Sequence, residues 1–533
     1  MQHFIGKQLI ELQLPDTTEA FELQQQFSHV FQQTVAPAME DLFDLYSTPD
    51  EVLYIDRLVI DIGAIDARQL RTDAWSLRVI QELQKVLENA QGNHSTDLIQ
   101  KTSTARSEFD RWLQLLNKGY LPLKSRLPEN LEDTIIQSLQ QDPTCAGRLK
   151  QTLKSNPNAV LRLAMQHQAA FLKFLLRQLA SVEPTVIHNS FAAWEAFWRH
   201  CRRLISLETK AFEQAAGKHG KAQIQELLQR IKAAMQQMAR HWGESASLTP
   251  DLISGEGSAR HTSVWFWSKW LKTVVESHSN QIGNTQQVFE ILFQKLLTIK
   301  ELELVIRLET SHKQPALNAI ETWVESNIKT IPTGIQAQPV LDEKEPLSPS
   351  LPERDEDEEA PFPAPEPGEV WYLDGAGVVL LHPFLSAFFQ RLGLVKNGAF
   401  TIEERRQKAV LLIHYLMSGA TNPSESELLL PKILCGVPMH QPVDTGLKLK
   451  KKELAEAEAL LSVVIEHWGV LGNASPEALR EGFLSRAGKL ENHALGRQLK
   501  IERQTLDLLL DQLPWGIGMI RLPWMPELII VEW

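Results

Sequence analysis

Two glycine-rich stretches of the sequence come close to the patterns that bind phosphate groups. A phosphate loop needs a lysine and a hydroxyl residue at a fixed distance from its first glycine. Gly482–Leu490 is one residue too long for that pattern and has Leu490 where serine or threonine is required. Gly375–Gly377 lacks the third glycine of a dinucleotide fingerprint, so a turn entering a helix explains it better. The sequence therefore predicts no nucleotide cofactor.

Histidine and cysteine side chains offer no complete catalytic or metal-binding pattern either. His467 has no second histidine at helical spacing, and His414 lies in an apolar stretch that is typical of a hydrogen-bonded core histidine. Cys435 could act as a nucleophile, but a small buried residue at a helix end is the usual reading of such a position. No Gly-x-Ser-x-Gly sequence occurs. We therefore predict a protein that is not an enzyme and that holds no metal or cofactor.

Charged residues on a predicted strand are candidates for contacts with a partner protein. Over Val52–Gly63, Asp56 points to one face of the strand, while Arg57 and Asp61 share the other face. As a catalytic pair they lack a helper residue, so the pattern favours a solvated strand face or a partner contact over catalysis.

Tryptophans near the end of the sequence are a second group of partner-contact candidates. Trp515, Trp524 and Trp533 recur every nine residues, and the first two follow a proline. Packing inside a small domain is one interpretation, and anchoring to a partner is the other, because tryptophan is enriched at interface hot spots. His382, between two apolar stretches, completes the candidates for partner contact.

The composition is that of an ordinary globular protein with an acidic balance. Hydrophobic residues make up 43% of the 533 residues and charged residues 23%, which excludes collagen-like, fully disordered and membrane-spanning classes. The net charge of −12 is opposite to the balance of a general nucleic-acid binder. Three widely spaced cysteines and the lack of a signal-peptide pattern after Met1 lead us to expect synthesis in the cytosol and no stable membrane insertion.

Apolar periodicity divides the sequence into four parts. Residues 1–66 read as a strand, a helix and a strand, and residues 67–330 have the helical period almost throughout, interrupted by prolines and glycines. Residues 331–368 combine many prolines with an acidic run and predict an extended, disordered linker. Residues 369–533 predict a compact, mainly helical domain that closes on a short strand at 528–533. The predicted fold class is mainly α with a small N-terminal α+β unit.

Several strings of residues resemble the tape measure proteins of contractile injection systems, which are phage-tail-like particles. The resemblance spans both ends of the chain, and in the middle only the string at 116–122 carries it. The strings are Met1–Gln8, Ile55–Gly63, Leu116–Pro122, Val378–Leu385, Ala409–Leu416, Lys432–Pro438, Leu508–Trp515, Leu522–Pro526 and Val531–Trp533.

The resemblance implies a structural component of a particle whose rigid tube is driven into a target cell by a contracting sheath. It implies contacts with tube, baseplate hub and spike proteins, several copies per particle, and a role in setting tube length and in assembling tube and baseplate. No nucleic acid is implied. The protein would be cytoplasmic during assembly and would then lie within the particle.

The helical part of the sequence does not read as a simple ruler. As one straight helix, residues 67–330 would reach about 400 Å, yet prolines and glycines break them into short amphipathic segments that can bury their apolar faces in a globule. A ruler would have to unpack during assembly. The other function class that the sequence allows is an acidic cytosolic scaffold or chaperone-like adaptor without catalytic activity.

Overall fold

The computed structural model describes residues 3, 5, 8, 10–11, 27, 29–46, 51–55, 58–65, 74–92, 99–121, 127–128, 130–180, 184–206, 221–240, 256–276, 285–293, 296–307, 315–328 and 370–533. The protein is mainly helical, as predicted. It divides into two compact units, residues 1–112 with 127–142, and residues 113–126 with 143–533. The linker predicted over 331–368 lies outside the described residues, and the predicted boundaries at 66, 330 and 368 stay predictions.

The first unit packs helices around one aromatic pair. The rings of Phe27 and Trp75 stack at 3.9 Å, and buried aliphatic side chains such as Leu83 surround them. The unit contains η1 (Phe31–Val35), α2 (Ala36–Tyr46), β1 (Glu51–Ile55), α4 (Ala74–Gly92), β2 (Ile99–Ser103), the first part of α5 (Thr104–Lys118) and α6 (Leu131–Gln141).

The strand predicted over Val52–Gly63 is shorter than the sequence suggested. β1 ends at Ile55 and pairs with β2 in an antiparallel ladder. Residues 58–65 are not part of a strand. The chain turns at Gly63, whose φ is +66° and whose N–H donates to the Asp61 carboxylate at 2.9 Å. Of the strand predicted near the start of the chain, residues 8, 10 and 11 are described and have no regular structure.

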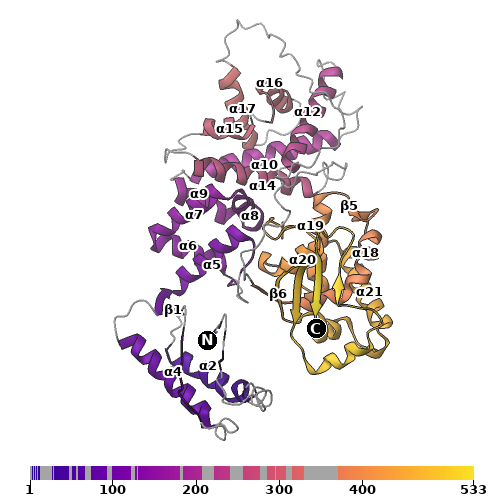
Figure 1. Cartoon of the computed structure of the whole chain (residues 1–533). Coiled ribbons are helices and arrows are strands. Elements are labelled where there is room, and N and C mark those ends of the chain that lie inside the picture. Colours follow the sequence, from indigo (N-terminus) through magenta and orange to yellow (C-terminus); the bar gives the residue numbers. More distant parts are fainter. Residues whose placement is uncertain are drawn as a thin grey trace. The chain divides into compact units, whose positions relative to one another are not determined.

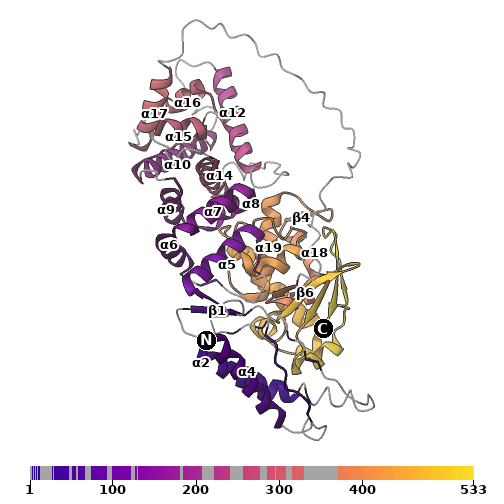
Figure 2. The same ribbon diagram turned by 60° about the vertical axis from the view of Figure 1, so that its left-hand side comes forward.

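In the second unit, a helical region over residues 143–328 is built around α14 (Glu256–Glu276). The middle of this helix is deeply buried, with Trp265, Phe266, Trp267 and Trp270 each at most 2% exposed. Helices α7, α8, α9, α10, α12 and α15 contact it. Figure 1 and Figure 2 show α10 and α14 side by side within this region. The remaining helices are α7 (Pro143–Ser155), α8 (Pro157–Gln166), α9 (Ala169–Ala180), α10 (Pro184–Ser206), α12 (Lys221–Arg240), α15 (Thr285–Phe293), α16 (Ile299–Arg307) and α17 (Pro315–Ile328).

Residues 370–533, called here the C-terminal domain, combine helices with a sheet of five strands in the order β3-β6-β7-β9-β8. The β7–β9 pair is parallel and the other pairs are antiparallel. Along β6 and β7, Leu490 and Leu499 are buried while Lys489 and Lys500 are half-buried on the other face, which is the alternation of a sheet with one covered side. The strands are β3 (Val370–Leu373), β6 (Gly488–His493), β7 (Gly496–Ile501), β8 (Met519–Ile520) and β9 (Leu528–Glu532).

The helices of this domain cover the inner side of the sheet. The 3-10 helix η2 (Ala376–Leu381) is wholly buried and contacts β6 and β7, and α19 (Glu403–Ser418) packs against α21 (Lys451–His467). The other elements are α18 (His382–Arg391), β4 (Val395–Lys396), β5 (Ala399–Phe400), η3 (Glu425–Leu428), α20 (Leu429–Leu434), η4 (Gly469–Leu471), α22 (Pro476–Leu479), η5 (Arg480–Leu484) and η6 (Thr505–Gln512). The final predicted strand is β9, whereas β6 and β7 were not predicted.

Candidate functional site

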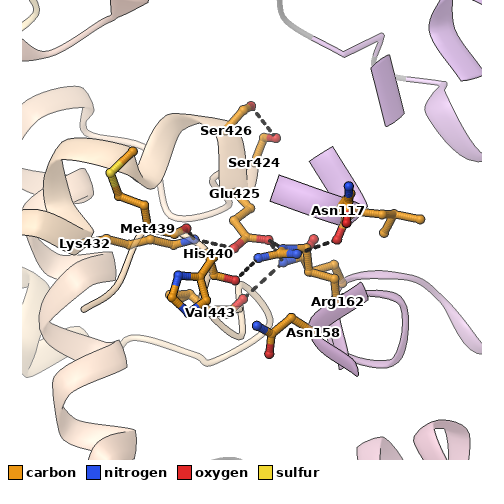
Figure 3. Close-up of polar contacts among 12 residues, drawn as sticks. Asn117, Asn158, Arg162, Ser424, Glu425, Ser426, Lys432, Met439, His440 and Val443 are labelled. Atoms are coloured by element: carbon orange, nitrogen blue, oxygen red, sulfur yellow. Dashed lines mark hydrogen bonds and ion pairs between the residues drawn. The ribbon is translucent and has the colours of Figure 1, made fainter. Parts of the chain in front are cut away.

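Charged side chains are buried where the helical region meets the C-terminal domain within the second unit. Arg162 of α8 and Glu425 of η3 are both 0% exposed, and the Arg162 Nε donates to the Glu425 Oε2 at 2.8 Å. Gln166, one turn further along α8, donates to the same carboxylate oxygen at 2.5 Å. The two partners of this ion pair are separated by 263 positions in the sequence. Figure 3 shows this cluster around Glu425. Together with the second ion pair described below, we call it the ionic junction.

Backbone carbonyl groups complete the coordination of the buried cations. Arg162 donates from Nη1 to the Leu116 carbonyl at 2.5 Å and from Nη2 to the His440 carbonyl. Lys432 of α20, also 0% exposed, binds the second oxygen of Glu425 and donates to the Met439 carbonyl at 3.1 Å. These contacts leave both cations with several acceptors each, as buried charges require.

The end of α5 and the start of α8 are held together so that Arg162 reaches across. Asn156 caps α8 by accepting from the Asn158 N–H at 2.9 Å, and Pro157 occupies the first position of the helix. The Asn156 Nδ2 also donates to the Asn117 carbonyl at 2.7 Å. The N-cap Asn156 and the proline that follows it fix the start of α8 against the end of α5. Arg162, further along α8, therefore lies beside the Leu116 carbonyl of α5.

Gly119 makes the close approach possible. Its φ of +83° lies in the left-handed region that other residues rarely adopt. A Cβ at this position would lie 2.9 Å from the Met439 carbonyl oxygen and closer still to the Arg162 guanidinium. Both a conformational and a steric reason therefore favour glycine here.

A second ion pair crosses the same junction. Arg260 of α14 binds Asp444 with two bonds, Nη2 to Oδ1 at 3.0 Å and Nε to Oδ2 at 3.2 Å. The Asp444 side chain is 0% exposed and that of Arg260 is 35% exposed. Asp444 also accepts from the Gly446 N–H at 2.9 Å. The bidentate geometry gives this pair a defined orientation as well as a charge match.

The cluster around Glu425 contains two cationic side chains and one carboxylate. Arg162 and Lys432 share a single carboxylate. Burial, helped by the Arg162 charge and opposed by Glu425, lowers the pKa of Lys432 to about 8. The closed junction therefore favours a neutral Lys432 more than water does.

The predicted tryptophan candidates all hydrogen bond to their own domain. The indole N–H of Trp515 donates to the Leu380 carbonyl at 3.0 Å and that of Trp524 to the Leu434 carbonyl at 2.8 Å. Trp533 donates to the Asp507 carboxylate at 3.1 Å. The three side chains are half-buried. These contacts agree with the packing interpretation and leave a contact with a partner as a prediction.

The remaining candidates are three charged residues of the predicted strand and one histidine. Asp56 and Arg57 lie outside the described residues, and Asp61 is exposed and accepts from Gly63. His382 is half-buried at the start of α18, its Nδ1 lies 3.0 Å from the Val379 carbonyl, and burial lowers its pKa. Trp515 bonds to Leu380 and packs edge-on against Phe384, on either side of His382 in the sequence, whereas Trp524 and Trp533 bond to Leu434 and Asp507.

Three residues from the incomplete sequence patterns lie in regular elements of the C-terminal domain or at their ends. Lys489, at the end of the incomplete phosphate pattern, lies in β6 and pairs with Glu491 at 3.0 Å. Cys435 is buried at the end of α20, and burial raises the pKa of its thiol well above the usual value. His414 is buried in α19, and burial lowers its pKa.

Among the described residues, no three His, Cys, Asp or Glu side chains come together as a metal site would require. Each helix among the described residues is too short or too polar to span a membrane.

Sequence reasoning did not identify the ionic junction. Two weak signals for it exist, because Arg162 and Lys432 each interrupt an apolar run, Leu161–Leu163 and Leu429–Leu434. Two strings of the family resemblance also contribute to it, through Leu116, Gly119 and Lys432. Nothing in the sequence near Glu425 indicates that it binds both Arg162 and Lys432.

Fold and site together define a mainly helical protein in which a folded helical region is joined to an α+β domain by buried charges. Comparison with protein families matches residues 2–533 to the contractile injection system tape measure protein family. The chain therefore belongs to this family, as the resemblance predicted. No curated protein and no solved structure matches it.

Proposed function

We propose that the chain controls tube length and takes part in the assembly of tube and baseplate in an extracellular-type contractile injection system. The match over residues 2–533 is the observation that carries this proposal, because it places the whole chain in the tape measure family. The proposed partners are the tube, baseplate hub and spike proteins, with several copies of the chain in each particle. The proposed route is assembly in the cytoplasm followed by residence in the particle, and the role requires no catalytic group.

The folded helices restrict where a length experiment can be made. Deleting part of residues 143–328 would remove helices whose aromatic side chains are buried against one another, such as Trp194 and Trp265. Loss of tubes would then report loss of folding. Residues 331–368 lie outside the described elements and are predicted from sequence to be extended, so their length can be changed with less effect on the packed cores.

The test is electron microscopy of particles assembled with chains that lack 12 or 24 residues within 331–368, and with a chain that carries 12 additional residues there. We expect the mean tube length to fall with each deletion and to rise with the insertion. Tubes of unchanged length that contain the chain would exclude length control and leave an assembly role.

The alternative function, a scaffold or chaperone-like adaptor, differs in where the chain ends up. A tape measure protein is retained in finished particles, whereas an adaptor leaves before completion. Immunoblotting of particles purified after sheath assembly distinguishes the two. Particles with full tubes and no detectable chain would support the adaptor and contradict the proposal.

The proposed partner contacts are Asp56, Arg57, Asp61, His382, Trp515, Trp524 and Trp533. Because the three tryptophans also contact their own domain, Asp61→Ala gives the cleaner test: its side chain is exposed and accepts from the Gly63 N–H in a local turn. Reduced incorporation into particles with unchanged thermal unfolding would support a contact at this face.

A further inference from the structure

The described contacts across the ionic junction include buried ion pairs and hydrogen bonds to backbone carbonyls. Arg162 and Gln166 reach Glu425, Arg260 reaches Asp444, and Arg162 also reaches the His440 carbonyl. An aromatic contact accompanies them, because the Tyr120 ring meets that of Trp371 edge-on at 6.0 Å. Water can solvate charges and carbonyl groups when such a surface separates, so separation loses less than exposing an apolar core.

Each side of the junction keeps partners of its own when the two sides separate. Glu425 retains Lys432, and Asp444 retains the Gly446 N–H, all within the C-terminal domain. On the other side, Arg162 retains the Leu116 carbonyl. Opening would therefore leave neither carboxylate without a partner in its own domain, which is the arrangement expected of a surface that closes and opens reversibly.

The cores on either side are bound much more firmly. In the helical region, Trp194 is 0% exposed, stacks on Trp265 at 5.1 Å and donates to the Thr262 carbonyl at 2.8 Å. In the C-terminal domain, the residues Val378–Leu381 and Ala409–Ile413 are each at most 1% exposed. Separation at either place would expose many large apolar side chains at once.

We propose that the ionic junction is a reversible latch, at which the folded helical region and the folded C-terminal domain separate without unfolding. The segment between them, residues 329–369, is 41 residues long and can span at most about 140 Å when fully extended. Opening the latch would therefore add reach to the chain while every described helix stays intact. The contribution of the latch to tube length rests on the proposed function. The opening and closing of the latch, in contrast, is a property of the isolated chain.

The charges of Arg162 and Lys432 have opposite effects on the closing of the latch. Closing brings Arg162 next to a carboxylate that Lys432 already neutralises, so Lys432 opposes closure. Removing the Arg162 charge removes a bond across the junction and favours opening. Removing the Lys432 charge instead leaves Glu425 with Arg162 as its counter-ion and favours closure.

The test is a distance measurement between spin labels on the full chain, placed at Gln178 in α9 and Ala459 in α21, both of which are exposed. Cys145, Cys201 and Cys435 are buried and should label poorly, which the chain without introduced cysteines checks. For Arg162→Met we expect the population at long distance to rise about tenfold or more relative to the unsubstituted chain. Asp444→Asn, on the second pair, should act in the same direction, and Lys432→Met should reduce that population.

Arg486→Met is the matched control, because Arg486 is also buried and paired, at 3.1 Å to Asp507, but within the C-terminal domain. It should lower stability without lengthening the distance. An unchanged distance distribution in both Arg162→Met and Asp444→Asn would overturn the latch, as would equal lengthening in Arg486→Met. Because no particles are used, a failed tube-length experiment leaves this result standing, and a failed latch leaves length control open to its own test.

Discussion

Gly119 shows how a single backbone position can hold a buried charge in place. Its left-handed conformation follows the end of α5, where the Leu116 carbonyl accepts from Arg162, and a Cβ at position 119 would lie against the Arg162 guanidinium and the Met439 carbonyl oxygen. Any side chain at position 119 competes with that guanidinium for room.

We therefore expect Gly119→Ala to lower the free energy of unfolding by about 2–4 kcal/mol, the sum of left-handed strain and overpacking. Gly393→Ala is the control, because Gly393 has a similar φ of +69° and open space around its missing Cβ. It should cost only about 1–2 kcal/mol. Urea unfolding of the three chains measures the difference, and equal losses would show that the space beside Arg162 does not matter.

Lys432 should make stability depend on pH in an unusual direction. Burial and the nearby Arg162 lower its pKa to about 8 in the folded chain, from an ordinary value of 10.5, while Glu425 opposes the shift. Between these two values the unfolded chain binds more protons than the folded one, so the contribution of this group to stability rises with pH. Below about pH 8 the amine is protonated in both states and the contribution is constant.

The measurement is the unfolding free energy of the unsubstituted chain minus that of Lys432→Met, determined from pH 7.5 to pH 9.5. Taking the difference removes the titration of other groups. We expect it to increase with pH, and a flat or falling difference would contradict a buried lysine with a lowered pKa.

At the scale of elements, α14 lies in the part of the sequence that is predicted to be helical, residues 67–330, but it lacks the single apolar stripe that identifies other helices. The stripe of Phe171, Leu172 and Leu175 identifies α9 because these side chains face one core. In α14, Trp265, Phe266 and Trp267 are consecutive and all buried, so no one-sided period exists to detect.

Strands β6 and β7 were missed for a different reason. Their alternation is present, since Leu490, Leu499 and Ile501 face inward, but charged residues on the outer face form a ladder in which Lys500 pairs with Glu491. Such a sequence resembles a solvated loop when read alone. The ionic junction was missed because Glu425 and Arg162 are brought together only by the packing of two distant parts of the chain.

The aromatic core of the helical region predicts a large loss on truncation. Trp194 packs against Trp265, Trp198 and Phe293 and is fully buried. Trp194→Ala should lower the free energy of unfolding by about 3–5 kcal/mol. Leu508→Ala, at a side chain that is 73% exposed, should change it by no more than about 0.5 kcal/mol. Thermal unfolding compares the two, and a small effect of Trp194→Ala would mean that the core repacks easily.

At the scale of the molecule, the structure reconciles a chain of packed helices with a family named for measuring length. A continuous helix is not needed if two folded parts can move apart while a connecting segment spans the distance between them. This requires the weakest surface in the second unit to be the ionic junction and the helical core to remain protected throughout.

Hydrogen exchange tests that requirement on the isolated chain. In Arg162→Met we expect faster exchange in peptides covering α8 and residues 425–444, whose amides lie beside the junction, because opening exposes them to water. Peptides covering α10 and α14 away from Arg260 should exchange as slowly as in the unsubstituted chain, since the stacked rings of Trp194 and Trp265 stay buried in the open form. Arg486→Met should leave α8 unchanged. Faster exchange throughout α10 and α14 in Arg162→Met would mean that the helical region unfolds together with the junction, and the chain would then gain length by unpacking its helices.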